Sequence, residues 1–217
     1  MVSLYIADIS RLSDPKDSPE LLQGLSEERI LKIQSQRQAD KRKQSLGAGL
    51  LLREVLWRHG VSEKSVYVGQ NGKPMAEELC FNISHSGQLV ACAIGDKPVG
   101  CDVEEMKAVP KGFVTRFFSD GERRYLQEFK DIAHQEAFFR LWTMKESYAK
   151  MTGEGMSSLL GSFEVLCGDS SLTKDGPRVL RDGSVQSCVF QEYHVPGYQI
   201  TVCAEEAEFK DLVFIEL

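Results

Sequence analysis

The sequence predicts an α+β protein made of two similar halves. Each half reads as helices followed by a mainly antiparallel sheet. The helical texture of residues 50–60 also resembles that of residues 141–153. We therefore expect a pseudo-two-fold pair of subdomains, residues 1–106 and 107–217, with the ligand site at their interface.

Length and composition are those of an ordinary globular protein. The 217 residues are 42% hydrophobic and 27% charged, and a chain of this size can bury roughly 70% of its unfolded surface. The formal charge of −6 argues against a nucleic-acid binder. The cysteines are scattered without metal-binding spacing, so we expect buried free thiols in a reducing cytoplasm. The sequence also lacks a signal-peptide pattern and an apolar run long enough to span a membrane.

The first half begins with a strand over residues 2–7 and continues with two helices. Ser26 caps the first helix, and we expect the break between the two near residues 38–43. The most basic stretch of the chain crosses this break: Arg29, Lys32, Arg37, Lys41, Arg42 and Lys43. This stretch is either a solvated charge run or an anion-binding patch.

A turn over residues 70–74 holds Lys73, and three strand-like segments follow it at residues 80–84, 89–94 and 99–104. The short turns between them predict an antiparallel meander. Side chains alternate along a strand, so Asp102 and Glu104 share one face. The two acids are either solvent-exposed at a strand end or ligands of Mg²⁺, which binds through one or two carboxylates.

The second half contains the long helix that we expect from about residue 134 to 151. Ser119 and Glu122 predict a capping box at the start of the helix before it. Strands are expected at residues 162–167, 187–193, 198–204 and 212–216. On the long helix, Glu146 and Lys150 are four residues apart, with Lys145 adjacent. They form either an ordinary surface ion pair or, with the acids of the first half, a site for a metal and a phosphate-bearing substrate.

Four segments together resemble, in order and spacing, the signature blocks of the 4′-phosphopantetheinyl transferases of the surfactin-synthetase-activating (Sfp) type. They are residues 72–74 (GKP), 81–87 (FNISHSG), 99–104 (VGCDVE) and 139–150 (FRLWTMKESYAK). Residues 116–119 (RFFS), with Glu122, resemble a further family segment. The length of the chain also fits the pseudo-dimeric type of this family.

The resemblance implies transfer of 4′-phosphopantetheine from coenzyme A to a serine of an apo acyl or peptidyl carrier protein, which releases adenosine 3′,5′-bisphosphate. Asp102, Glu104 and Glu146 would hold Mg²⁺. Glu146 would also deprotonate the serine, directly or through a water, and Lys150 would balance the charge of the leaving phosphate.

The same resemblance implies the coenzyme A contacts. Ser84 and His85 would bind its phosphates, Lys73 would lie along the nucleotide, and Lys145 would contact neighbouring phosphate oxygens. Lys43, with Arg42 adjacent, would meet the 3′-phosphate, and Arg29 and Lys32 are further candidates. The carrier protein is expected on an apolar and basic patch: Phe113, Arg116, Phe117, Arg123 and Arg124.

Two other functions would use the same residues. One is a Mg²⁺-dependent pyrophosphate hydrolase acting on coenzyme A or a nucleotide, with water as the attacking group. The other is a non-catalytic module that binds carrier proteins. In each case two complementary halves make a monomer sufficient.

Overall fold

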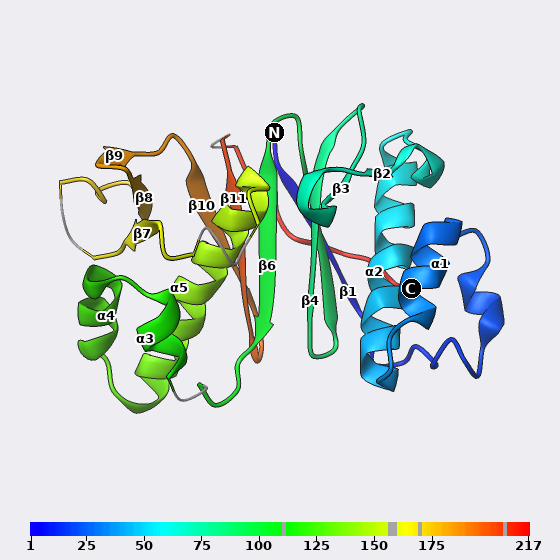
Figure 1. Cartoon of the computed structure of the whole chain (residues 1–217), viewed down its shortest axis with the longest axis horizontal. Coiled ribbons are helices and arrows are strands. Elements are labelled where there is room, and N and C mark those ends of the chain that lie inside the picture. The colour runs from blue at the N-terminus through cyan, green and yellow to red at the C-terminus, as the bar shows by residue number, and fades with distance from the viewer. Residues whose placement is uncertain (110–111, 156–159, 169–170, 206–207) are drawn as a thin grey trace.

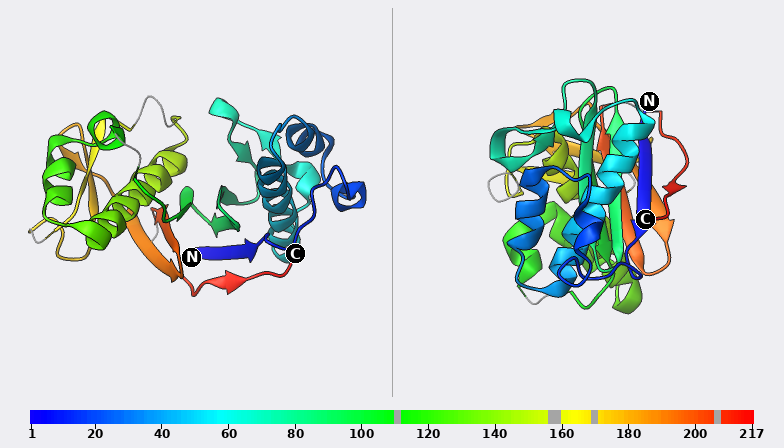
Figure 2. Two further views of the ribbon diagram at one scale, coloured as in Figure 1. Left: turned by 90° about the horizontal axis from the view of Figure 1, so that it is seen from below. Right: turned by 90° about the vertical axis from the view of Figure 1, so that its right-hand side faces the viewer.

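Two β-sheets lie side by side at the centre of the molecule, with helices on either side (Figure 1). The structure, a computed structural model, describes residues 1–109, 112–155, 160–168, 171–205 and 208–217. Seen from below, helices α2 (Ala39–Arg58) and α5 (Asp131–Thr152) stand on opposite sides of the centre (Figure 2). This mixed arrangement of helices and antiparallel sheets confirms the predicted α+β class.

The first sheet has the strand order β12-β1-β5-β4. Its strands are β1 (Ser3–Asp8), β4 (Cys80–Ser86), β5 (Leu89–Gly95) and β12 (Val213–Phe214). Strand β5 pairs antiparallel with both β1 and β4, whereas β12 runs parallel to β1. Both faces of β5 are buried, because Val90 and Cys92 pack with α2 while Leu89 and Ala91 pack with the second sheet.

Two helices and a small hairpin complete the first half. Helix α1 (Glu27–Gln34) begins at Ser26, whose hydroxyl accepts the Arg29 N–H as predicted. The break between α1 and α2 lies at residues 35–38, slightly before the predicted position. The remaining elements are η1 (Pro19–Leu22), η2 (Glu63–Ser65), β2 (Tyr67–Val68), η3 (Gln70–Gly72) and β3 (Pro74–Met75).

The other larger sheet, with the order β10-β11-β6, joins β6 of the first half to two strands of the second half, which also holds a smaller sheet, β7-β8-β9. The strands of these two sheets are β6 (Val99–Glu105), β7 (Phe163–Leu166), β8 (Arg178–Arg181), β9 (Ser184–Val185), β10 (Val189–Val195) and β11 (Tyr198–Ala204). Helices α3 (Phe113–Phe117) and α4 (Asp120–Gln127) precede α5. Strands β8 and β9 were not among the sequence predictions.

The predicted three-stranded meander is wrong at its third strand. Strand β6 follows β5 in the chain, but its backbone pairs with β11 in the other sheet. On the edge that faces β4, side chains of β4 accept hydrogen bonds from the backbone of β6. Asn82 accepts the Cys101 N–H at 2.9 Å, and Ser84 accepts the Val103 N–H at 3.3 Å. These bonds satisfy β6 without a continuous backbone ladder, so the two sheets meet at β4 and β6.

Helix α5 packs closely against β6 at Gly100. A Cβ atom at this position would collide with the backbone of α5 at Ser147 and Met151. The absence of a side chain therefore lets the helix approach the strand that carries Asp102.

A buried ion pair joins α5 to α4 and β7. Lys145 and Glu122 have no exposed side-chain surface, and the Lys145 Nζ lies 2.8 Å from Glu122 Oε1. Glu122 also accepts the backbone N–H groups of Ser119, in the predicted capping box, and of Val165.

None of the helices in the described part of the chain has the length and apolar character that spanning a membrane requires.

Replacing Lys145 by alanine should lower the free energy of unfolding by about 3–5 kcal/mol, because Glu122 would remain buried without its cation. The matched control is Arg58→Ala, which removes a partly exposed i,i+4 partner of Glu54 and should cost less than about 1 kcal/mol. Urea unfolding of the two variants measures both values. Equal losses would show that the buried pair is not a principal support of α5.

Candidate active site

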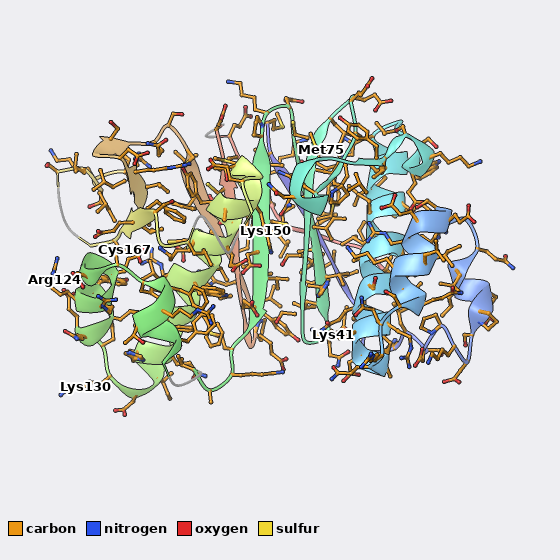
Figure 3. The ribbon with its side chains drawn as sticks, in the orientation of Figure 1. Lys41, Met75, Arg124, Lys130, Lys150 and Cys167 are labelled. Carbon is orange, nitrogen blue, oxygen red and sulfur yellow. The ribbon has the colours of Figure 1, made fainter. Side chains whose placement is uncertain are left out.

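An ionic cluster lies where α5, β6 and β4 meet. The Lys150 Nζ of α5 lies 2.6 Å from Asp102 Oδ1 and 2.9 Å from Ser84 Oγ. The Ser84 hydroxyl in turn donates to Asp102 Oδ1 at 2.8 Å. Lys150 lies in the middle of the molecule, between the two halves (Figure 3). The structure therefore brings together three of the predicted site residues from three different elements.

The carboxylates around this cluster are held in an unfavourable environment. Burial raises the pKa of Asp102, against the influence of Lys150 and Ser84. Burial, with repulsion from Asp102, likewise raises the pKa of Glu104. Burial is also the main cause that raises the pKa of Glu146 to about 7, with Asp102 and Glu104 adding to it. Although burial opposes its charge, the acids raise the pKa of Lys150.

The acidic group has the features expected of a site for Mg²⁺. Asp102 is 2% exposed, and its Oδ2 atom is buried without a hydrogen-bond partner among the described residues. In the protein by itself, no group of three or more His, Cys, Asp or Glu side chains among the described residues is placed so that it could hold a metal ion. A partial set of carboxylates suits Mg²⁺, because this ion keeps several waters and binds substrate phosphates.

A basic region lies beside this cluster, on the first half. Arg29, Lys32 and His85 line a cavity of about 120 Å³ together with Asn82 and Pro74. Although the His85 residue is exposed at its outer side, partial burial of the imidazole together with the cations Lys41 and Lys150 lowers its pKa to about 4. His85 is therefore a neutral hydrogen-bonding group at pH 7, in a region where the fixed positive charge comes from Arg29, Lys32 and Lys41.

Lys73 lies at the end of α5. Its Nζ donates to the carbonyl of Lys150 at 2.6 Å, and Asn71 donates to that of Gly153 at 2.9 Å. These carbonyls are the ones that a helix leaves unsatisfied at its C-terminus. The turn around Lys73 thus fastens the first half to the helix that carries Glu146 and Lys150.

Two expected phosphate-binding residues are corrected by the structure. Lys145 projects away from Glu146 into the buried pair with Glu122, so its ammonium does not reach the cluster. Arg42 is buried and donates to Asp14 and to the carbonyls of Gln36 and Arg37. Both side chains are used to hold elements together.

The ammonium of Lys43, on α2, is directed at the loop after β1, with its Nζ 3.4 Å from the carbonyl of Ser10. Lys41 was predicted only to belong to the basic stretch of the sequence. In the structure it is the residue of α2 whose charge lowers the pKa of His85. Ser86 belongs to the FNISHSG block but had no predicted role of its own, and its hydroxyl donates to Glu104 at 2.7 Å. The signal for Ser86 was available, since it alternates with Asn82 and Ser84 on one face of β4.

Buried acids and a lysine thus lie between the two halves, beside a basic cavity. A family model described as the 4′-phosphopantetheinyl transferase superfamily matches residues 98–203.

The chain is similar along most of its length to two transferases of Bacillus. It is 39% identical over 170 residues to the 4′-phosphopantetheinyl transferase psf-1 of Bacillus pumilus. This alignment covers 72% of this chain and 70% of that protein. It is 35% identical over 170 residues to the 4′-phosphopantetheinyl transferase Sfp of Bacillus subtilis (strain 168), covering 75% and 74% of the two chains.

Among solved structures, the fold is similar to that of a holo-(acyl-carrier-protein) synthase from Bacillus anthracis str. Ames in complex with CoA (3′,5′-ADP). The superposition covers 49% of this chain and 92% of the chain of that synthase. The identity is 19% and the TM-score is 0.40. Because its sequence is 39% and 35% identical to those of the two Bacillus proteins, the chain belongs to the 4′-phosphopantetheinyl transferase superfamily. It is an enzyme of that class, as the sequence blocks indicated.

The raised pKa of Glu146 predicts an unusual dependence of stability on pH. In the unfolded chain this carboxyl ionises near 4.5, whereas the folded protein keeps the proton up to about pH 7. Between these values the folded state binds more protons, so its stability falls as pH rises. Without Mg²⁺, Glu146→Gln should be more stable than the wild type at about pH 8, by on the order of 1–3 kcal/mol.

Urea unfolding in a chelating buffer between about pH 4 and pH 8 measures this difference, which should shrink towards the acid end. The exposed Glu78→Gln is the matched control, and its difference from the wild type should stay small throughout. A stabilisation by Glu146→Gln that is the same at every pH would contradict the assignment.

Proposed function

We propose that this enzyme transfers 4′-phosphopantetheine from coenzyme A to a serine hydroxyl of an apo acyl or peptidyl carrier protein and releases adenosine 3′,5′-bisphosphate. The observation that carries the proposal is the cluster of Asp102, Ser84 and Lys150, with Glu146 beside it. The printed names of the Bacillus relatives support the same reaction class.

Asp102, Glu104 and Glu146 would hold Mg²⁺, and the unpartnered Asp102 Oδ2 supports this role. When bound, the ion would offset the negative charge of the pyrophosphate and of the three carboxylates. The residues supplied by the protein are therefore arranged for binding and proton transfer.

Glu146 is the proposed general base. Its raised pKa, about 7, lies close to a neutral working pH, where a carboxylate accepts a proton most effectively. The carrier serine would lose its proton to Glu146, directly or through one water, as its oxygen attacks the β-phosphorus of coenzyme A. We favour the route through water, because a carboxylate that also binds a metal is a weak base.

Lys150 is proposed to act on the leaving group. The bond that breaks joins the β-phosphorus to the oxygen bridging it to the α-phosphate, which departs as part of adenosine 3′,5′-bisphosphate. Lys150 stays charged, since Asp102 and Glu146 raise its pKa. Its ammonium can therefore stabilise the charge that develops on this oxygen.

The basic cavity is proposed to hold the nucleotide end of coenzyme A. Arg29 and Lys32 carry the charge expected of a 3′-phosphate site, and neutral His85 can donate or accept a hydrogen bond. Lys73 would lie along the nucleotide while it caps α5. Lys43 is a weaker candidate than Lys32, because its ammonium is directed at Ser10.

The carrier protein is proposed to dock on α3 and the start of α4. Exposed Arg116 stacks over the Phe117 ring at 5.0 Å, and Phe113 packs on Trp142 with ring centroids 4.6 Å apart. Trp142 lies one helical turn before Glu146, so a partner on this patch would be next to the proposed base. Arg124 is exposed, whereas Arg123 is tied to the carbonyl of Phe118.

Since both halves contribute to the proposed site, a monomer would be sufficient for activity.

The protein is proposed to work in a reducing cytoplasm. The buried free thiols of four cysteines support this location: Cys92, Cys101, Cys188 and Cys203.

Incubation of the protein with coenzyme A, Mg²⁺ and a panel of apo carrier proteins should add the mass of one phosphopantetheine to a carrier. Glu146→Gln should lower the transfer rate about 10²–10⁴-fold, and Asp102→Ala should abolish it. Glu78→Gln, at an exposed position, is the control that should keep the wild-type rate.

Mass spectrometry of the carrier and chromatography of the nucleotide product separate the alternatives. Product release without a carrier would identify a hydrolase, and carrier binding without coenzyme A binding would identify a silent module. Full activity of Glu146→Gln would refute the proposed base.

The 3′-phosphate assignment predicts a selective loss of affinity. Lys32→Ala should weaken coenzyme A binding by about 10-fold, the value of one lost charge-assisted contact, while binding of 3′-dephospho-coenzyme A stays unchanged. Titration calorimetry compares the two ligands. Lys130→Ala, at the far lower left of Figure 3, is the control for loss of one surface charge. Equal weakening of both ligands would place the 3′-phosphate elsewhere.

A further inference from the structure

Three side chains of β4 replace a backbone ladder along β6. Asn82, Ser84 and Ser86 alternate on one face of β4 and accept the N–H groups of Cys101, Val103 and Glu105. The regular spacing keeps each acceptor opposite its donor, so the interface has a fixed register. Each of the two serines also keeps its hydroxyl hydrogen for a second bond.

Ser86 uses that hydrogen on Glu104. Its Oγ accepts the Glu105 N–H at 3.1 Å and donates to Glu104 Oε2 at 2.7 Å. A hydroxyl has one hydrogen, so the backbone contact fixes the direction in which Ser86 donates. The Trp142 side chain of α5 also acts to lower the pKa of Glu104, so Ser86 and Trp142 favour the charged carboxylate from both halves of the protein.

Glu104 needs such support more than Asp102 does. Asp102 is fixed by Lys150 and Ser84, whereas Glu104 is only half-buried and is repelled by Asp102. A glutamate side chain has more freedom to rotate than an aspartate. Without the Ser86 hydroxyl, the carboxylate would gain both the freedom and an electrostatic reason to turn towards solvent.

We propose that Ser86 is a positioning residue, which holds the Glu104 carboxylate in the orientation that binds Mg²⁺ with coenzyme A. This inference rests on the proposed function, because it assumes that Glu104 is a ligand of that ion. Ser86 differs from Ser84, which touches Lys150 and belongs to the reacting group. Groups that orient metal ligands are worth about 10–100-fold in metal affinity.

The test measures Mg²⁺ binding to the complex of the enzyme with coenzyme A by titration calorimetry, in the absence of any carrier. Ser86→Ala should weaken Mg²⁺ binding by about 10-fold, and Ser86→Thr, which keeps the hydroxyl, should stay close to the wild type. The matched control is Ser65→Ala, since this half-buried hydroxyl donates only to the carbonyl of Ser62. Coenzyme A affinity without Mg²⁺ should be the same in all four proteins.

A double-mutant cycle separates positioning from a general structural role. In a Glu104→Gln background, Ser86→Ala should cause little further loss of Mg²⁺ affinity, because the group on which it acts has gone. Ser86→Cys provides the same comparison with a weaker donor if the alanine variant does not fold. Additive losses, or wild-type Mg²⁺ affinity in Ser86→Ala, would overturn the proposal.

The outcome is readable apart from the transfer reaction. A wild-type protein that modified no carrier but showed the expected pattern of Mg²⁺ affinities would refute the proposed function and support the role of Ser86. A protein that transferred phosphopantetheine with an unchanged Mg²⁺ affinity in Ser86→Ala would do the reverse.

Discussion

Strand β6 is shared between the two halves, and the position of every group in the site depends on this. Its backbone completes the sheet of the second half through β11, while the side chains of β4 reach it from the first half. Asp102 and Glu104 are therefore placed at the boundary, where α5 brings Glu146 and Lys150 against them. Gly100 permits the close packing of α5 that makes this possible. The site is thus a property of the interface and of neither half alone.

The electrostatics of this boundary are unfavourable in the protein by itself. Three carboxylates have raised pKa values, and one oxygen of Asp102 is buried without a partner among the described residues. Lys150 offsets only part of the repulsion. On the other side of α5 the charges are balanced, because Lys145 and Glu122 form a fully buried ion pair. The buried pair holds α5 on one side, and Glu146 faces the acids of β6 on the other.

Local patterns in the sequence predicted much of this site. Alternation along a strand placed Asp102 and Glu104 together, and helical spacing joined Glu146 to Lys150. The same spacing could not show that Lys145, one residue earlier, faces a buried acid, because that requires the position of α4. The direction of Arg42 likewise depends on Asp14, which is distant in sequence. Strand pairing was the largest error, since the partner of β6 lies about a hundred residues further along the chain.

The pairing of β12 with β1 has a consequence for how the chain folds. The first strand of the protein receives its parallel neighbour from residues 213–214, and β6 receives an antiparallel neighbour from residues 198–204. Contacts of such long sequence separation are slow to form, because the loop between the partners must close first. During synthesis, the first half leaves the ribosome with one edge of β1 and one edge of β6 still unpaired. The sheet that carries Asp102 and Glu104 is therefore completed only after residues 198–204 have been synthesised.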